Sequence, residues 1–186
     1  LEISITSIGG RKVEKMTESI RIGNCSGFYG DRLAAAKEMV DGGPIDVLTG
    51  DYLAELTMTI LYNQIQSRGE NMGYVGTFLK QVKDVAQDCK DKNIKIITNA
   101  GGLNPKSMAV EIEKILEELN IEMKVAWIDG DDIKDDIERL QDEGEHFINM
   151  DRGIPLSESS NKVVTANTYL GAWGIKEALD QGADIV

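Results

Sequence analysis

Short β-branched segments alternate along this chain with longer segments of helical periodicity, and that alternation limits the folds open to it. Strands are expected at 20–25, 45–49, 94–98 and 123–128. Helices are expected at 31–40, 52–68, 77–90, 104–119, 133–140 and 169–179. Such alternation is typical of βαβ units with right-handed crossovers. We therefore predict an α/β fold with a doubly wound, mostly parallel, Rossmann-like sheet and helices on both faces.

The segments at the two ends of the chain have a different sequence pattern from its middle. Leu1 to Lys15 are interpreted as a leader or an added extension, or equally as an edge strand, because apolar and polar residues alternate at the start. Residues 16–186 are expected to form one domain. Val163-Val164 is a further candidate strand, and Ala183 to Val186 resembles the beginning of another. That apolar ending predicts that the chain is part of a longer protein.

Charge and cysteine content narrow the class of protein. The 186 residues carry a formal net charge of −12 without a polybasic run, which argues against nucleic-acid and membrane-surface partners. The two cysteines, Cys25 and Cys89, lack CxxC spacing and favour a reduced, cytoplasmic location. Cys89 falls on the apolar face of a predicted helix and is expected in the core.

Glycine and short polar residues gather in the segments that follow the predicted strands. In a parallel sheet these segments meet at one edge, which is where α/β folds place ligands. Glycine lets the backbone approach a ligand closely, and helix N-termini favour anions. The residues expected to bind a ligand there are Asn24, Ser26, Gly27, Arg32, Thr49, Gly50, Asn99, Gly101, Gly102 and Asn104.

The segment after the third strand has the clearest local pattern. Asn104 suits a helix N-cap and Pro105 the first helical position. Ala100-Gly101-Gly102 could present backbone N–H groups to a carboxylate or phosphate. A tight turn before a capped helix explains the same residues, so both interpretations stay open.

Two residues of this edge are candidates for a catalytic role. Cys25 lies at a strand end near a predicted helix start, where a thiolate can be stabilised. Asp51 follows the second strand and could move a proton. For Cys25 the alternative is a small buried residue without a catalytic role.

No cofactor is identified by the sequence. Asp129 and Asp131 could hold a divalent metal, although capping of the next helix is the favoured interpretation. His146 is the only histidine, which argues against a histidine-based triad or metal site. Gly23, Gly27 and Gly30 are spaced GxxxGxxG rather than GxGxxG, which argues against a nicotinamide cofactor at the turn after the first predicted strand.

Several long segments resemble the N-terminal domain of the acyclic terpene utilisation family, AtuA. They are IRIGNCSGFYGDR (Ile20 to Arg32), GGPIDVLTGDYLAELTM (Gly42 to Met58), IKIITNAGGLNP (Ile94 to Pro105), IDGDD (Ile128 to Asp132) and ANTYLGAWGIKEALDQGADIV (Ala166 to Val186). Chains of that family usually continue past the point where this one stops.

The resemblance implies a catabolic protein of acyclic terpene or branched acyl-CoA metabolism. On that basis we expect an enzyme of unassigned reaction that binds a small carboxylate or acyl-CoA. A non-catalytic ligand-binding or scaffold subunit is the alternative, and an NAD(P)-dependent oxidoreductase is a second one. A homo-oligomer is a further expectation, since such domains often self-associate through helices that flank the sheet.

Overall fold

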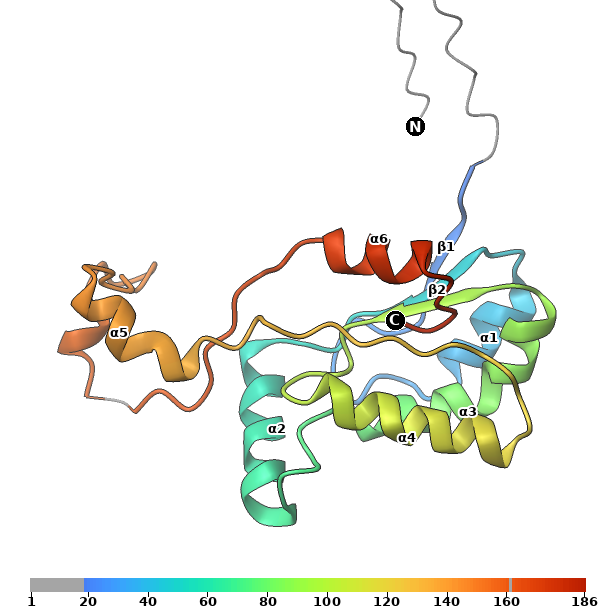
Figure 1. Ribbon diagram of the computed structural model, residues 1–186, viewed down its shortest axis with the longest axis horizontal. Helices are drawn as coiled ribbons and strands as arrows, with labels where there is room; N and C mark the ends of the chain where they lie inside the picture. The colour runs from blue at the N-terminus through green and yellow to red at the C-terminus, as the bar shows by residue number, and fades with distance from the viewer. Residues whose placement is uncertain (1–18, 161) are drawn as a thin grey trace, which may run out of the picture.

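The computed structural model describes residues 19–160 and 162–186 and has an α/β fold (Figure 1). Its sheet holds β1 (Ile22–Asn24), β2 (Val47–Gly50) and β3 (Lys95–Thr98), side by side in that order and all parallel. Each strand was predicted and begins one or two residues later than expected. The predicted leader or edge strand at Leu1 to Lys15 lies outside the described residues.

Two further segments extend the sheet beyond β3 without forming strands. Ile185 bridges Ile96 of β3 on one side and Val125 on the other, both in parallel orientation. The backbone bonds Thr98 N to Val186 O (3.0 Å) and Ala126 N to Ile185 O (2.8 Å) hold these segments together. The expected start of a strand at 183–186 therefore lies beside β3. The strand predicted at 123–128 was wrong, since only Val125 forms a bridge, and Val163-Val164 is not a strand either.

Helices cover the sheet on both faces (Figure 1). α1 (Ala35–Gly42), α3 (Gly76–Asp91) and α4 (Pro105–Glu118) lie below it in this view, and α6 (Trp173–Asp180) lies above it. The three lower helices bury apolar stripes against Leu48, Ile96 and Ile185, each 1% exposed. Cys89 is 0% exposed within this core, as expected.

Three helices differ from expectation at their starts, and one of them, α6, begins at Trp173 rather than Tyr169. α1 begins at Ala35 rather than Asp31, because the Asp31 carboxylate accepts from the backbone N–H groups of Gly27 and Arg32 in a turn. α2 (Glu55–Arg68) begins three residues after Tyr52, whose side chain turns back into the core. Within α2, only Thr57 and Leu61 are buried.

The segment from 133 to 166, called the arm below, projects away from the rest of the molecule (Figure 1). It holds a 3-10 turn, η1 (Lys134–Asp136), then α5 (Ile137–Asp142) and a second turn, η2 (Leu156–Glu158). The helix predicted at 133–140 is thus a short helix with an irregular start. The arm is closed at its base by bonds from Ile133 N to Ala166 O (2.9 Å) and from Thr168 N to Asp131 O (2.8 Å).

In the part of the chain that the structure describes, no helix combines the length and apolar character needed to span a membrane.

Candidate functional site

The loops that follow β1, β2 and β3 lie next to one another at the carboxyl edge of the sheet and are joined by hydrogen bonds. Cys25 N donates to Thr49 O (2.8 Å), and Asp51 N donates to Ser26 O (3.0 Å). On the other side of β2, the hydroxyl of Thr98 donates to Gly50 O (3.0 Å). The parallel pairing therefore brings the three predicted loop segments together as one surface.

Asp51 and Asn99 form the polar contact between two of these loops. Asn99 Nδ2 donates to Asp51 Oδ1 (2.6 Å), while Asn99 Oδ1 accepts from the backbone N–H of Tyr52 (2.8 Å). A flipped Asn99 amide would place its NH₂ group against that N–H, so its orientation is fixed. Both side chains are exposed. The carboxylate of Asp51 is thus held in place and still open to solvent.

Tyr52 anchors this pair to the core. Its side chain is 2% exposed, packs edge to face on Phe78 with ring centroids 5.7 Å apart, and donates from its hydroxyl to Gln81 Oε1 at 2.5 Å. The desolvation of the buried phenol raises the pKa of Tyr52 well above its ordinary value. A Cβ on Gly50 would lie 2.6 Å from the Tyr52 ring, which is why glycine precedes Asp51 here.

Sequence reasoning missed this anchor because it placed Tyr52 inside a helix. Gln81 carried a signal that could have found it. In α3 it lies at helical spacing with Phe78, Val82 and Val85, so it takes a position on the buried face. A glutamine at such a position needs a buried partner for its amide. Tyr52 is that partner.

Cys25 lies beneath the edge rather than on it. It is 3% exposed, and its Sγ is 3.9 Å from the hydroxyl of Tyr52. Burial raises the pKa of the Cys25 thiol, because desolvation disfavours the thiolate. Ser26 is buried beside it, and its hydroxyl donates to Phe28 O (3.0 Å). Asn24, Gly27, Phe28 and Gly30 of this loop are exposed.

Asn24 and Arg32 line a shallow hollow between the start of α1 and the 42–45 turn. Arg32 Nη1 pairs with Glu38 Oε1 of α1 at 2.6 Å, and both side chains are more than half exposed. The backbone N–H of Gly27 is bound to Asp31, which lowers the pKa of that carboxyl. The predicted anion contact of Arg32 therefore competes with an existing ion pair.

The turn after β3 is explained by its own packing. Ala100 N donates to the Thr98 hydroxyl (3.1 Å) and Gly102 N to Asn99 O (3.1 Å), so two of the three amides proposed for an anion are already bonded. Gly102 has φ +55°, and a Cβ there would overlap Leu61 of α2. Asn104 caps α4 as predicted, since its Oδ1 accepts from Ser107 N (3.1 Å) and Pro105 opens the helix.

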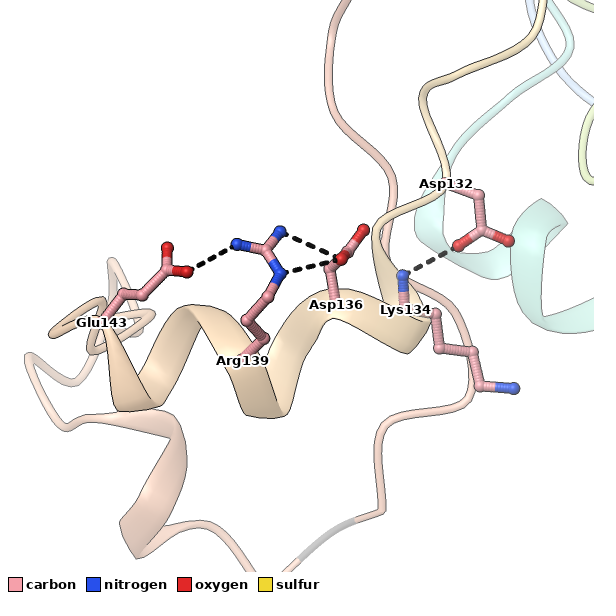
Figure 2. Close-up of polar contacts among 5 residues, drawn as sticks. All are labelled: Asp132, Lys134, Asp136, Arg139 and Glu143. Atoms are coloured by element: carbon pink, nitrogen blue, oxygen red, sulfur yellow. Dashed lines mark hydrogen bonds and ion pairs between the residues drawn. The ribbon is translucent and has the colours of Figure 1, made fainter.

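Asp129 and Asp131 lie apart from this edge, at the base of the arm. Asp131 Oδ2 accepts from Asn167 Nδ2 (3.0 Å), and Asp129 is exposed. Asp132 Oδ1 accepts from the backbone N–H of Lys134, the first residue of η1, at 2.9 Å (Figure 2). Among residues 19–160 and 162–186, no three histidine, cysteine, aspartate or glutamate side chains are grouped as metal ligands.

The acidic helix that follows is exposed and internally paired. Arg139 lies between Asp136 (2.9 Å) and Glu143 (2.8 Å), with all three side chains at least half exposed (Figure 2). Exposed pairs of this kind contribute little to stability, roughly 0 to 1 kcal/mol each. The side chains form a solvated helix surface.

A second hollow lies at the amino end of the sheet, between α4 and the 121–124 segment. Its walls are formed by Val110, Leu116, Ile121 and Met123, with lysine and glutamate side chains around them. None of the predicted ligand-binding residues lines it. We therefore place the candidate site at the carboxyl edge, around Asp51 and Asn99.

A protein-family model matches the chain over residues 20–186, and its description is acyclic terpene utilisation family protein AtuA. No curated protein and no solved structure matches the chain.

Proposed function

We propose a function on the premise that this chain belongs to the acyclic terpene utilisation family AtuA, which its match over residues 20–186 shows. The family name associates the chain with the use of acyclic terpenes. We propose that it is a cytoplasmic catabolic protein that binds an acyclic or methyl-branched acyl substrate at the carboxyl edge of its sheet. Asp51 and Asn99 form the polar centre of that site.

One observation carries this proposal. An exposed carboxylate is held in a single orientation by an amide that is itself fixed by the backbone, and the whole pair is anchored through Tyr52 to buried Gln81. Functional groups that act on a ligand need such support from packed neighbours. An exposed carboxylate such as that of Asp51 suits proton transfer to or from a bound group.

Binding is tested with the whole chain by calorimetry against acyclic alcohols, acids and their CoA esters. We expect at least one of these ligands to bind, and Asp51→Ala or Asn99→Ala to weaken its affinity by about tenfold, the value of a hydrogen bond to a charged group. Asp84→Asn is the control. Asp84 lies on the exposed side of α3, so this substitution removes one negative charge away from the three loops. Equal affinities in all variants would move the site away from this edge.

A non-catalytic binding subunit is the second candidate, and the state of Cys25 favours it. Burial keeps this thiol protonated, so it is not prepared as a nucleophile. Turnover assays on the ligands that bind separate the two functions. An enzyme that uses Asp51 should lose turnover in Asp51→Asn and keep it in Cys25→Ser, whereas a binding subunit gives no product in any variant.

A further inference from the structure

The segment from 121 to 127, called the outer segment below, lies at one edge of the sheet. In Figure 1 it is the gold trace that crosses the view between α4 and α6. Lys124 O accepts from Ile185 N (3.1 Å), and Ala126 N donates to Ile185 O (2.8 Å). These two residues therefore point their backbone groups inward, towards the rest of the sheet.

The backbone groups on the other side of the outer segment are unpaired. Successive residues of an extended chain point their N–H and C=O groups in opposite directions, so those of Met123 and Val125 face away from Ile185. None of these four groups has a partner in the part of the chain that the structure describes. The outer segment also contains no proline. An open edge of this kind pairs readily with another extended chain.

The side chains of the outer segment are divided between its two faces. Ile121, Met123 and Val125 are partly buried and pack against the core. Glu122 and Lys124 are exposed, and neither side chain forms an ion pair within residues 19–160 and 162–186. The edge thus presents one acidic and one basic side chain, two residues apart on the same face, that are free to pair with another chain.

A second copy of the outer segment complements this edge. A twofold axis perpendicular to the sheet makes the two segments antiparallel and keeps each side chain on its own face. If Met123 lies opposite Met123 of the second copy, the two outward-facing residues exchange backbone hydrogen bonds. Glu122 of each copy then lies opposite Lys124 of the other, and Ile121 lies opposite Val125. Opposite charges and apolar side chains in directly opposed positions stabilise a strand pair.

Other symmetric registers lack this match. Sliding one copy by two residues brings either Glu122 opposite Glu122 or Lys124 opposite Lys124, and like charges in opposed positions are destabilising. A register centred on Val125 leaves Lys124 opposite Ala126 and forms no charge pair. The distribution of charge along the outer segment therefore favours the register centred on Met123.

The opposite edge of the sheet, β1, has no such complementarity. Its outward groups belong to Ile22 and Asn24, because Arg21 O and Cys25 N bond to the β2 side. Arg21 is the one charged residue between 19 and 25, and it is already bound to Asp46. No charge pair is left there to fix a register between two copies.

We infer that the outer segment is the interface with a second copy of this chain, and that the two segments pair antiparallel about an axis beside Met123. The two sheets then form one continuous sheet. The hollow between α4 and this segment, about 650 Å³ in volume, lies next to the apolar side chains of the second copy. The inference is independent of the proposed ligand site, which lies at the carboxyl edge.

The test measures the dimer dissociation constant of the whole chain by sedimentation velocity over a series of concentrations. Glu122→Lys and Lys124→Glu each place like charges opposite each other twice, so we expect each to weaken the dimer by at least about tenfold. The double variant restores opposite charges in reversed order and should regain a constant close to the native one. Glu138→Lys is the control, since it makes the same charge change on the exposed side of α5.

A mixture of the two single variants gives the sharpest comparison. The Glu122→Lys chain carries two basic residues at the edge and the Lys124→Glu chain two acidic ones. They should therefore form a heterodimer with each other although each dimerises poorly alone, and native mass spectrometry identifies it by mass. Both side chains are exposed, so the variants should keep the native circular dichroism spectrum.

A native chain that stays monomeric at every concentration would overturn the inference. So would a dimer whose dissociation constant is the same in all the charge variants, since its interface must then lie elsewhere. A double variant that is as weak as the single ones, with no heterodimer in the mixture, would also reject the pairing of Glu122 with Lys124.

Discussion

The arm and the rest of the chain contain similar kinds of residue but use them differently. The body, residues 19–126 and 183–186, buries a continuous core that includes Leu48, Leu61, Phe78 and Ile96, each at most 2% exposed. The arm also contains apolar side chains, yet no described residue between 117 and 182 is buried. Met150 of the arm is 99% exposed and Ile148 is 52% exposed.

This difference indicates where the stability of the fold comes from. Burial of apolar side chains is the main term that offsets the loss of chain entropy on folding. The body has that term and the arm has little of it. The arm depends instead on backbone bonds at its base, on short turns and on exposed ion pairs such as Arg139 with Glu143. The candidate site belongs wholly to the body.

The largest effect that separates the two regions should come from removing one apolar side chain from each. Leu61→Ala deletes a side chain that is 0% exposed and should lower the free energy of unfolding by about 2–5 kcal/mol. Met150→Ala should change it by less than about 0.5 kcal/mol. Urea unfolding followed by circular dichroism measures both. A comparable loss in Met150→Ala would mean that the arm is packed in solution.

A glycine pair gives the next largest contrast. Gly102→Ala places a Cβ against Leu61 and 2.9 Å from Gly73 O, at φ +55°, and should cost about 1–3 kcal/mol or more. Gly130→Ala, near the base of the arm, also has a positive φ of +100°, but nothing lies within 4 Å of its Cβ. Denaturant midpoints of the two variants separate overlap from backbone strain. If Gly130→Ala is as destabilised as Gly102→Ala, overlap with Leu61 adds nothing.

The same contrast explains which parts of the structure could be predicted from sequence. β2, β3, α3 and α4 were located to within about two residues because their apolar periodicity matches a buried face. Residues 123–128 alternate like a strand, but they lie at the outer side of Ile185, where only one bridge forms. In the residues that follow, the apolar pattern does not correspond to a buried face, because no described residue between 117 and 182 is buried. The prediction of helix and strand in the arm was therefore partly wrong.

The candidate site also has features that the sequence predicts and features that it does not predict. That the three loops come together follows from a parallel sheet, and the capping role of Asn104 follows from a local motif. The sequence does not predict which backbone amides remain free, because some of their hydrogen-bond partners come from distant segments, as Ser26 O does for Asp51 N and Gly73 O for Leu103 N. Gly102 was interpreted as a residue for ligand approach, whereas its contact with α2 alone requires glycine. The roles of Cys25 and Asp51 in binding or catalysis stay predictions.

Ion pairs should distinguish the regions by their pH dependence. In the body, Arg21 binds both oxygens of Asp46 (2.7 and 3.0 Å) and donates from its backbone N–H, which lowers the pKa of Asp46 to about 2. Because this carboxyl is more acidic in the folded state, its contribution to stability is present above its ordinary pKa of 3.8 and is lost as the pH falls towards about 2. Asp46→Asn should remove that part of the acid dependence.

The control is Glu143→Gln in the arm, which breaks an exposed pair with Arg139. Its unfolding curve between about pH 4 and pH 2 should keep the native slope, since an exposed pair of this kind contributes little. Parallel acid dependence in the native protein and in Asp46→Asn would show that the Arg21 contacts do not persist in solution.

The smallest effect is expected from the largest change, removal of the arm itself. Asp132 and Asn167 are paired as antiparallel neighbours at its base, so the two ends of the excursion lie at a distance that a two-residue turn spans. Replacing residues 133–166 with Asn-Gly should leave the core intact and change the free energy of unfolding by less than about 1 kcal/mol. Closing the shorter loop costs less conformational entropy, and this lower cost favours the folded state. Ligand affinity at Asp51 should also be unchanged, because no arm residue bonds to the three loops among the contacts of the described residues.

Amide hydrogen exchange on the native protein supplies the matching observation, with α5 exchanging orders of magnitude faster than β2 and β3. If deletion unfolds the body, or if α5 is protected as well as the strands, the arm must be packed against something that gives it the burial it lacks here.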